Sequence, residues 1–189
     1  MKLSHGLRSR LARVKLLVFD VDGVLTEGRI IYTDEGAEAK AFDVKDGLGV
    51  RVASAAGLQV AIMTGRASRV VERRARDLRI SDVLQRVGDK AAALIRLASS
   101  KGIGLEEVAF MGDDLNDREA MRLVGVSIAP GDAVAEVRQA ADAVTDAPGG
   151  RGAARETVEA ILRAQDRWDE AVTTYLEGLA ERDRSRRTE

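Results

Sequence analysis

The chain has 189 residues, enough for one domain with a sizeable core, and its 30 Lys and Arg against 31 Asp and Glu give a formal net charge of −1. This balance excludes a general attraction to nucleic acid or to a membrane surface, so neither is predicted as a partner. The absence of cysteine excludes disulfides, thiolate metal sites and a cysteine nucleophile. No apolar run reaches membrane-spanning length, and the basic N-terminus precedes too short an apolar run for a signal peptide, so we expect a cytoplasmic protein.

The first strong element is the apolar run Leu16–Phe19, which follows a predicted short helix over 4–13. Four apolar residues in succession favour a strand buried on both faces of a parallel sheet. The strand is followed by Asp20 and Asp22, at the position where open α/β sheets bind ligands. Two close carboxylates repel each other unless a cation joins them, which suggests Mg²⁺ with one carboxylate as nucleophile. Taken alone, the stretch could equally be an acidic turn.

A β-hairpin is predicted next, with strands over 29–33 and 38–44 on either side of Asp34-Glu35-Gly36. It is an insertion, because it interrupts the expected crossover from strand to helix. An isolated hairpin is only marginally stable in water. We therefore expect this one to pack against another surface, such as a partner subunit.

Helices and strands alternate through the rest of the chain. A helix over 46–56 has an apolar stripe of Leu48, Val52 and Ala55, and Gly57 closes it. The further strands are predicted over 58–63, 83–84, 107–111, 126–129 and 143–145, and the further helices over 68–78, 89–101, 116–123, 133–140 and 155–179. The alternation predicts an α/β fold with a doubly wound parallel sheet. We expect one domain over 1–169, then a helix end over 170–189 whose last residues, 181–189, are disordered.

Polar side chains occur at four of the predicted strand ends or helix starts. They are Asp20 with Asp22, Thr64, Lys90, and Asp113 with Asp114. Each has an ordinary alternative: Thr64 could cap a helix, Lys90 could be an exposed helix lysine, and the later aspartates could cap the next helix. These alternatives do not explain why such groups recur at strand ends. Because the carboxyl ends of parallel strands share one edge of a sheet, the groups can converge there.

The set resembles the four motifs of the haloacid dehalogenase superfamily of phosphatases. The matching segments are DVDGVLT (20–26), MTGR (63–66), Lys90 and GDDLND (112–117). The resemblance implies that Asp20 attacks phosphorus, Asp22 transfers protons, and Thr64 donates a hydrogen bond to the phosphoryl group. It implies that Lys90 neutralises phosphoryl charge and shields Asp20 from Asp22.

The same resemblance implies a metal site and the absence of a cap domain. Mg²⁺ would be held by Asp20, Asp113 and the backbone carbonyl of Asp22, with Asp114 orienting the loop or a metal-bound water. Cap domains in this superfamily follow the first or the second motif, and neither interval here has room for one. The chain thus looks like a Rossmann-like haloacid dehalogenase core with a hairpin insertion and no cap.

Three further segments look like the 3-deoxy-D-manno-octulosonate 8-phosphate phosphatase family. They are KAFDVKDGLGVR (40–51), MTGR and PGGRGAARE (148–156), and the likeness covers about 15–169. It implies a small phosphorylated sugar acid as substrate, a place in lipopolysaccharide biosynthesis, and a homotetramer in which hairpins pack together and the C-terminal segment reaches a neighbouring site.

The likeness also implies a set of substrate contacts. They are Asp43, Val44, Lys45, Asp46, Gly47, Arg51, Arg66, Arg74, Lys90 and Asn116. Arg66 and Arg74 could hold the sugar carboxylate, and the acidic and amide side chains could bind sugar hydroxyls. The alternative for Arg74 is plain exposure on an arginine-rich helix. Arg151 and Arg155 are expected to reach across a subunit interface.

Other functions are compatible with the sequence. The most similar alternative is a phosphatase of a nine-carbon, sialic-acid-type 9-phosphate, because such enzymes share the four motifs. A non-catalytic module that keeps the fold would be expected to lose Asp20 or Asp22, and a phosphomutase would be expected to carry a cap. A protein phosphatase would require an open, monomeric site. The single histidine, His5, lies outside every motif, so no catalytic imidazole is predicted.

Overall fold

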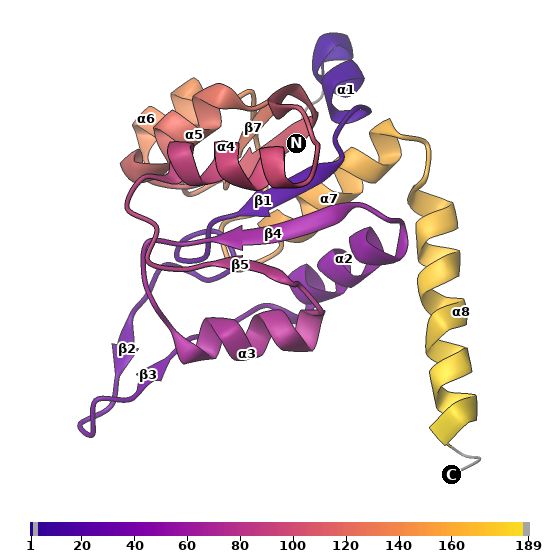
Figure 1. Cartoon of the computed structure of the whole chain (residues 1–189), viewed down its shortest axis with the longest axis horizontal. Helices are drawn as coiled ribbons and strands as arrows, with labels where there is room; N and C mark the ends of the chain where they lie inside the picture. The colour runs from indigo at the N-terminus through magenta and orange to yellow at the C-terminus, as the bar shows by residue number, and fades with distance from the viewer. Residues whose placement is uncertain (2–3, 187–189) are drawn as a thin grey trace.

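The computed structural model describes residue 1 and residues 4–186. Six parallel strands form one sheet in the order β5-β4-β1-β6-β7-β8, and a separate two-stranded hairpin joins β2 and β3 (Figure 1). The sheet strands are β1 (Leu16–Phe19), β4 (Gln59–Met63), β5 (Asp82–Leu84), β6 (Val108–Met111), β7 (Val126–Ala129) and β8 (Ala143–Val144). The predicted doubly wound α/β fold is therefore confirmed.

Helices cover both faces of the sheet (Figure 1). On one face lie α2 (Val44–Ala55), α3 (Arg69–Leu78) and α7 (Ala153–Ala164), and on the other α4 (Lys90–Ser100), α5 (Arg118–Leu123) and α6 (Ala135–Ala140). A short α1 (His5–Leu11) precedes β1 and buries Leu7 and Leu11 with the first of these layers. Each layer has its own hydrophobic cluster, and the alternating side chains of the central strands feed both.

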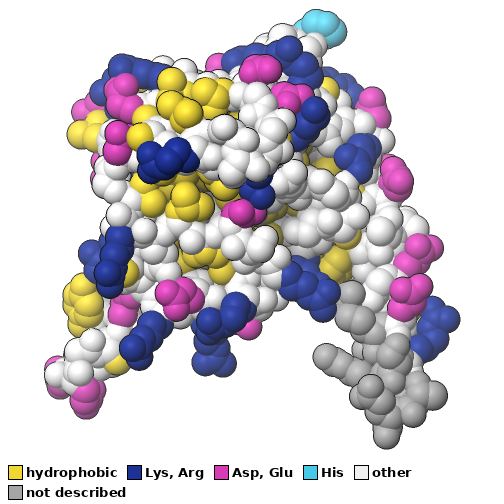
Figure 2. All heavy atoms as spheres, viewed as in Figure 1, with side chains coloured by type: hydrophobic (Ala, Val, Ile, Leu, Met, Phe, Trp, Pro, Cys, Tyr) yellow, Lys and Arg dark blue, Asp and Glu magenta, His cyan; other side chains and the backbone are white. Residues whose placement is uncertain are grey.

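The hairpin consists of β2 (Ile31–Tyr32) and β3 (Glu38–Ala39), which are shorter than the predicted strands. It projects from the sheet edge near the carboxyl ends of the strands, as Figure 1 shows at the lower left. Ile30, Ile31 and Tyr32 are 42%, 50% and 63% exposed. Apolar side chains thus gather over the hairpin at the left of the molecular surface (Figure 2).

The buried face of α2 differs from the predicted apolar stripe. Leu48 is 39% exposed and Ala55 is exposed, whereas Val52 is buried as predicted. The helix buries Gly47 and Gly49 together with Val50, Val52 and Ala53. A Cβ at Gly49 would lie 3.2 Å from Arg155 Cα and one at Gly47 would lie 2.2 Å from Arg74 Nη2. The small residues let α2 approach α7 and α3 closely, which an apolar stripe of larger side chains would prevent.

The predicted single helix over 155–179 is wrong, because the chain forms α7 and then α8 (Trp168–Arg186). Asp166 adopts a left-handed backbone conformation (φ 54), and Arg167 N donates to Leu162 O at 2.8 Å, which ends α7. Residues 181–186 are helical where disorder is predicted, and 187–189 lie outside the described residues. The domain boundary at 169 stays a prediction. In the part of the chain that the structure describes, no helix combines the length and apolarity that a membrane crossing requires.

Candidate active site

The carboxyl ends of the three central strands bring the predicted site together. Phe19, the last residue of β1, is in register with Ile62 of β4 and Met111 of β6. The polar residues just beyond these strand ends, Asp20 and Thr64, therefore lie at the same edge of the sheet, and they are 5% and 2% exposed. Asp20 N donates to Met111 O at 3.0 Å, so the backbone continues the strand pairing up to the first aspartate.

Lys90 reaches this edge from the first turn of α4. Asp89 caps that helix by accepting from Ala92 N at 2.9 Å, so the helix begins at Lys90. The Lys90 ammonium lies 3.0 Å from Asp20 Oδ1 and 2.5 Å from Asp117 Oδ1, and the residue is 3% exposed. Burial opposes the charge of Lys90, but the two carboxylates raise its pKa. The lysine is therefore held as a cation beside Asp20.

Asp117 is a functional side chain to which the sequence assigns no role. It is fully buried in the 3₁₀ turn Leu115–Asp117, and its Oδ2 accepts from the backbone N–H of Asp113 at 3.1 Å and of Asp114 at 3.3 Å. The Lys90 ammonium contacts Asp20 and Asp117, and its expected shielding of Asp20 from Asp22 stays a prediction. The only sequence signal was the last residue of GDDLND, which is indistinguishable from a helix cap when read alone.

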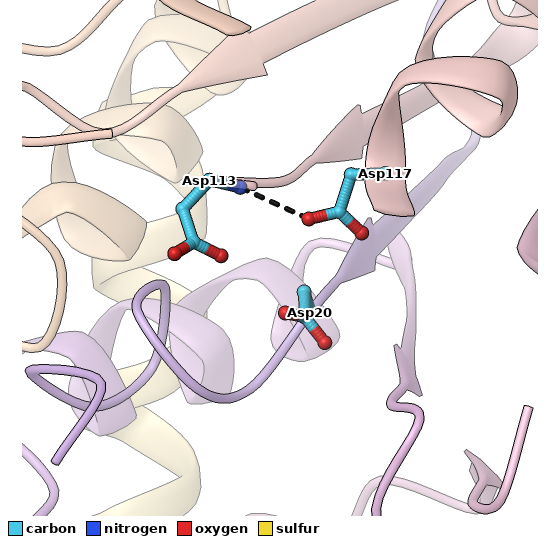
Figure 3. A group of neighbouring side chains, drawn as sticks. All are labelled: Asp20, Asp113 and Asp117. Atoms are coloured by element: carbon cyan, nitrogen blue, oxygen red, sulfur yellow. Dashed lines mark hydrogen bonds between the residues drawn. The ribbon is translucent and has the colours of Figure 1, made fainter. Parts of the chain in front are cut away.

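Three carboxylates converge at the sheet edge and fit a divalent cation. One oxygen each from Asp20, Asp113 and Asp117 lie within 4.8 Å of one another (Figure 3). Asp113 Oδ1 is buried and has no hydrogen-bond partner among the residues that the structure describes. Burial, then the charges of Asp20 and Asp117, raise the pKa of Asp113 to about 8, and burial, then Asp117, raises the pKa of Asp20 to about 6. An all-oxygen donor set with excess negative charge is what Mg²⁺ binds.

Gly23 is required for this arrangement. It has φ +93, and a Cβ there would lie 1.9 Å from Asp113 Oδ2. A side chain would therefore be strained by its backbone and would also displace the carboxylate. The glycine of DVDGVLT lets the loop after β1 approach Asp113.

Asp22 is oriented toward the hairpin. Its carboxylate forms an ion pair with the ammonium of Lys40, a side chain with no exposed surface, and Lys40 also lies 3.4 Å from Glu38 Oε1. Arg66 Nη2 donates to the Tyr32 hydroxyl at 2.8 Å, and its guanidinium lies 4.0 Å from Asp22 and 3.8 Å from Glu38. The sequence reasoning did not foresee Lys40 or Glu38 at the site. The metal contact predicted for the Asp22 carbonyl stays a prediction.

The predicted substrate contacts at the start of α2 differ from one another in exposure and in hydrogen-bond partners. Asp43 caps the helix, accepting from Lys45 N at 2.6 Å, while Val44 is 81% exposed and Lys45 is exposed. Arg74 Nη2 donates to Asp43 O at 3.0 Å, and its guanidinium lies 5.4 Å from the Phe42 ring centroid. Arg74 is thus attached to the same segment rather than simply exposed on α3.

The remaining predicted contacts are more scattered. Asn116 is exposed in the turn beside Asp117. Arg51 lies about two turns along α2, where its Nη1 donates to Asp77 O at 3.4 Å. Gly47 is buried against Arg74, and Asp46 is buried with both carboxylate oxygens accepting from backbone N–H groups. The roles of these residues in substrate binding stay predictions.

Three residues whose roles the sequence leaves open have clear partners within the chain. Asp114 accepts from Leu115 N at 2.7 Å, in line with the expected orientation of its loop. Arg151 forms an ion pair with Glu27 at 2.9 Å. Arg155 pairs with Glu159 at 2.6 Å and lies 4.9 Å from the Trp168 ring centroid. The contact across a subunit interface expected for both arginines stays a prediction.

The fold and the site define a class of enzyme with a cluster of carboxylates at the edge of a parallel sheet. Residues 79–156 match the sequence profile of the family described as haloacid dehalogenase-like hydrolase. That stretch runs from the end of α3 to α7 and contains Lys90 and the GDDLND segment. The class expected from the four motifs is confirmed.

Individual relatives narrow the class. The chain is 42% identical over 169 residues to 3-deoxy-D-manno-octulosonate 8-phosphate phosphatase KdsC of Escherichia coli K12, covering 89% of this chain and 90% of the relative. The Yersinia pestis phosphatase of the same name superposes with a TM-score of 0.87 at 40% identity, covering 88% of this chain and 90% of that one. The Moraxella catarrhalis phosphatase, solved with magnesium, phosphate and KDO, gives 0.86 at 42% identity, covering 89% and 97%. The chain therefore belongs to the 3-deoxy-D-manno-octulosonate 8-phosphate phosphatase family of haloacid dehalogenase-like hydrolases.

Proposed function

We propose that this chain is a Mg²⁺-dependent phosphatase that hydrolyses 3-deoxy-D-manno-octulosonate 8-phosphate to the free sugar acid and phosphate. The observation that carries the proposal is Asp20, a buried carboxylate at the sheet edge with Lys90 at 3.0 Å and Asp113 beside it. The substrate follows from the relatives, whose names specify this sugar acid phosphate. A phosphoric monoester hydrolase is also what the aspartate nucleophile and the adjacent ammonium suit chemically.

The first half of the reaction forms an aspartyl-phosphate. An Asp20 oxygen attacks phosphorus while the bond to the sugar oxygen breaks, and Asp22 gives its proton to that departing oxygen. Lys90 neutralises charge on the phosphoryl oxygens, and the Thr64 hydroxyl donates a hydrogen bond to them. Bound Mg²⁺, held by Asp20 and Asp113, would supply the charge neutralisation that lets an anionic nucleophile meet an anionic phosphoryl group.

The second half releases phosphate. Asp22 takes a proton from water, the water oxygen attacks phosphorus, and the bond to Asp20 breaks, which regenerates both aspartates in their starting forms. Lys90 again faces the phosphoryl charge, and Asp117 keeps the ammonium in place from its other side at 2.5 Å. Asp20, Asp22 and Lys90 therefore each act twice in one turnover.

A homotetramer in the cytoplasm completes the proposal. It is supported by the exposed apolar side chains of the hairpin, Ile30, Ile31 and Tyr32, which a partner subunit would cover. The hairpin also carries Lys40, which pairs with Asp22, so packing of hairpins would bear directly on the site. Sedimentation of the purified chain, with Tyr32→Ser as the matched variant, tests this assembly.

A kinetic screen tests the function. We expect kcat/KM for the eight-carbon 8-phosphate to exceed that for a nine-carbon 9-phosphate by at least about 10-fold, because one pocket cannot position both phosphates equally. EDTA should stop turnover and Mg²⁺ should restore it, while Asp20→Asn should release no phosphate under any condition. Preference for the nine-carbon substrate would contradict the substrate, and metal-independent turnover would contradict the role of the ion.

A further inference from the structure

Asp46 caps a helix to which it does not belong. It lies in the first turn of α2, is 3% exposed, and accepts from Arg155 N at 2.8 Å through Oδ1 and from Gly152 N at 3.1 Å through Oδ2. Gly152 is the N-cap residue of α7 and has no side chain to cap the helix itself. The Asp46 carboxylate therefore supplies the acceptors and the negative charge that the start of α7 needs.

The segment before α7, residues 148–152, lies against the loop that carries the nucleophile; we call this segment the strap. Gly150 N donates to Val24 O at 2.8 Å. A Cβ at Gly149 would lie 1.8 Å from Gly23 O, and one at Gly150 would lie 2.4 Å from the carbonyl carbon of Thr26. Backbone thus packs directly on backbone, which only glycine permits.

Carboxylates hold the strap at both ends. Gly149 N donates to Asp132 Oδ1 at 2.8 Å, and Gly152 N donates to Asp46. The strap contacts the loop that follows β1. Gly23 in this loop lies so close to Asp113 that a Cβ on Gly23 would overlap the Asp113 carboxylate. A shift of the strap would therefore displace the loop between Asp20 and Val24, because no flexible side chain lies between the two backbones.

We propose that Asp46 is a positioning residue that, by capping α7, holds the strap against Gly23 and Val24 and so fixes the loop carrying Asp20 and Asp22. This inference rests on the proposed phosphatase function. It gives Asp46 a role in place of the sugar-hydroxyl contact predicted from the sequence, because both of its oxygens bind backbone N–H groups inside the protein. The strap acts on the chemistry common to every phosphate ester rather than on recognition of the sugar.

Asp46→Asn tests the proposal with two substrates, the sugar acid 8-phosphate and p-nitrophenyl phosphate. The amide replaces one acceptor with a donor that faces a backbone N–H, so the cap is weakened at constant size. We expect kcat to fall by roughly 10-fold or more and by the same factor on both substrates, with KM for the sugar phosphate changed by less than about 2-fold. A raised KM for the sugar phosphate alone, with p-nitrophenyl phosphate turnover intact, would overturn the proposal.

Asp142→Asn is the matched control for stability. Asp142 Oδ2 also accepts from a backbone N–H, that of Ser127 at 2.9 Å. This bond lies near the amino ends of the strands, away from the site, because Ser127 is in the first half of β7 and Asp142 comes just before β8. We expect this variant to lower the melting temperature and leave kcat unchanged when both are assayed well below that temperature. If both variants lowered kcat in proportion to their loss of stability, a merely structural role would explain Asp46.

Gly149→Ala approaches the strap from its other end, and Gly6→Ala, at a helical glycine with open space around it, is its control. The alanine at 149 should lower kcat on both substrates, and the double variant with Asp46→Asn should lose less than the product of the single losses, because both act on one strap. Multiplicative losses would contradict the proposal. If the wild type cleaved p-nitrophenyl phosphate but not the sugar phosphate, the proposed substrate would be wrong. The kcat values of the variants on p-nitrophenyl phosphate would still decide the role of Asp46.

Discussion

Two charged groups meet at the same sheet edge, and their charge balance differs. The first, which we call the edge group, sets the carboxylates of Asp20, Asp113 and Asp117 against the single ammonium of Lys90. The second, the hairpin group, sets Asp22 and Glu38 against Lys40 and Arg66. The edge group therefore carries excess negative charge, whereas the hairpin group is neutral.

The pKa values follow this difference. In the edge group, burial and neighbouring carboxylates raise the pKa of Asp113 to about 8. In the hairpin group, burial also opposes ionisation of Glu38, but a hydrogen bond from Ser68 and the charges of Lys40 and Arg66 lower its pKa. Excess negative charge at the sheet edge therefore favours binding of a cation, whereas balanced charge attaches the hairpin to Asp22.

Removing the only cation of the edge group should have the largest effect. Lys90→Met leaves Asp117 and Asp20 buried without a counter-charge, so we expect a loss of about 3 kcal/mol in the free energy of unfolding in EDTA and a fall in kcat of more than about 10³-fold. Urea unfolding and phosphate release measure the two effects. Lys101→Met removes a lysine that pairs with Asp82 at the far edge and should cost less than about 1 kcal/mol without affecting kcat. Retained activity in Lys90→Met would show that the edge group does not depend on its internal cation.

The excess charge should also appear as a pH dependence of the metal-free protein. The folded-state pKa of Asp113 lies near 8 and that of Asp20 near 6, both above the unfolded value of 3.8, so the folded state binds more protons. Stability should therefore fall as pH rises from about 5 to about 8, since protons retained by the folded state must be given up. Acids with lowered pKa values, such as Glu107 and Asp142, lose their contribution only as pH falls toward or below their ordinary range.

Melting temperatures in EDTA across that pH interval measure this slope. Saturating Mg²⁺ should flatten or reverse it, because a cation replaces the protons, and Asp113→Asn should flatten it without metal. The hairpin group gives the control: Glu38→Gln should leave the slope unchanged, because its folded-state pKa lies below the interval. A melting temperature that rose with pH in EDTA would contradict the assignment of excess charge to the edge group.

The sequence was sufficient for the features set by local pattern. The bounds of β1 and β7 were predicted without error, because the apolar run of β1 ends at Asp20 and β7 lies between Gly125 and Pro130. Asp20, Thr64, Lys90 and Asp113 were expected at one edge, since parallel strands place their carboxyl ends together. The break between α7 and α8 was missed, because Gln165–Arg167 contains neither glycine nor proline and Asp166 takes up the left-handed conformation instead.

The partners of the site residues depend on tertiary contacts that no local pattern encodes. Asp117 resembles an ordinary acidic cap until Lys90 is placed 2.5 Å from it. Lys40 follows a hairpin strand whose docking direction the sequence leaves open, so its pairing with Asp22 could not be predicted. Asp46 was expected at the substrate because its segment resembles the family, and no local pattern predicts that the close approach of α2 and α7 brings its carboxylate to backbone N–H groups.

The smallest expected effect comes from breaking the balance of the hairpin group. Lys40→Met leaves Asp22 and Glu38 with Arg66 alone, and because Arg66 is 42% exposed, water and the arginine together screen the remaining charge. We expect a loss of about 1 kcal/mol in unfolding free energy and of about 10-fold in kcat. Adding Glu38→Gln removes the surplus carboxylate, so the double variant should be more stable than the sum of the single losses predicts. Urea unfolding of the four proteins measures this coupling, and strict additivity would mean that packing of the hairpin, rather than its charge balance, holds it against Asp22.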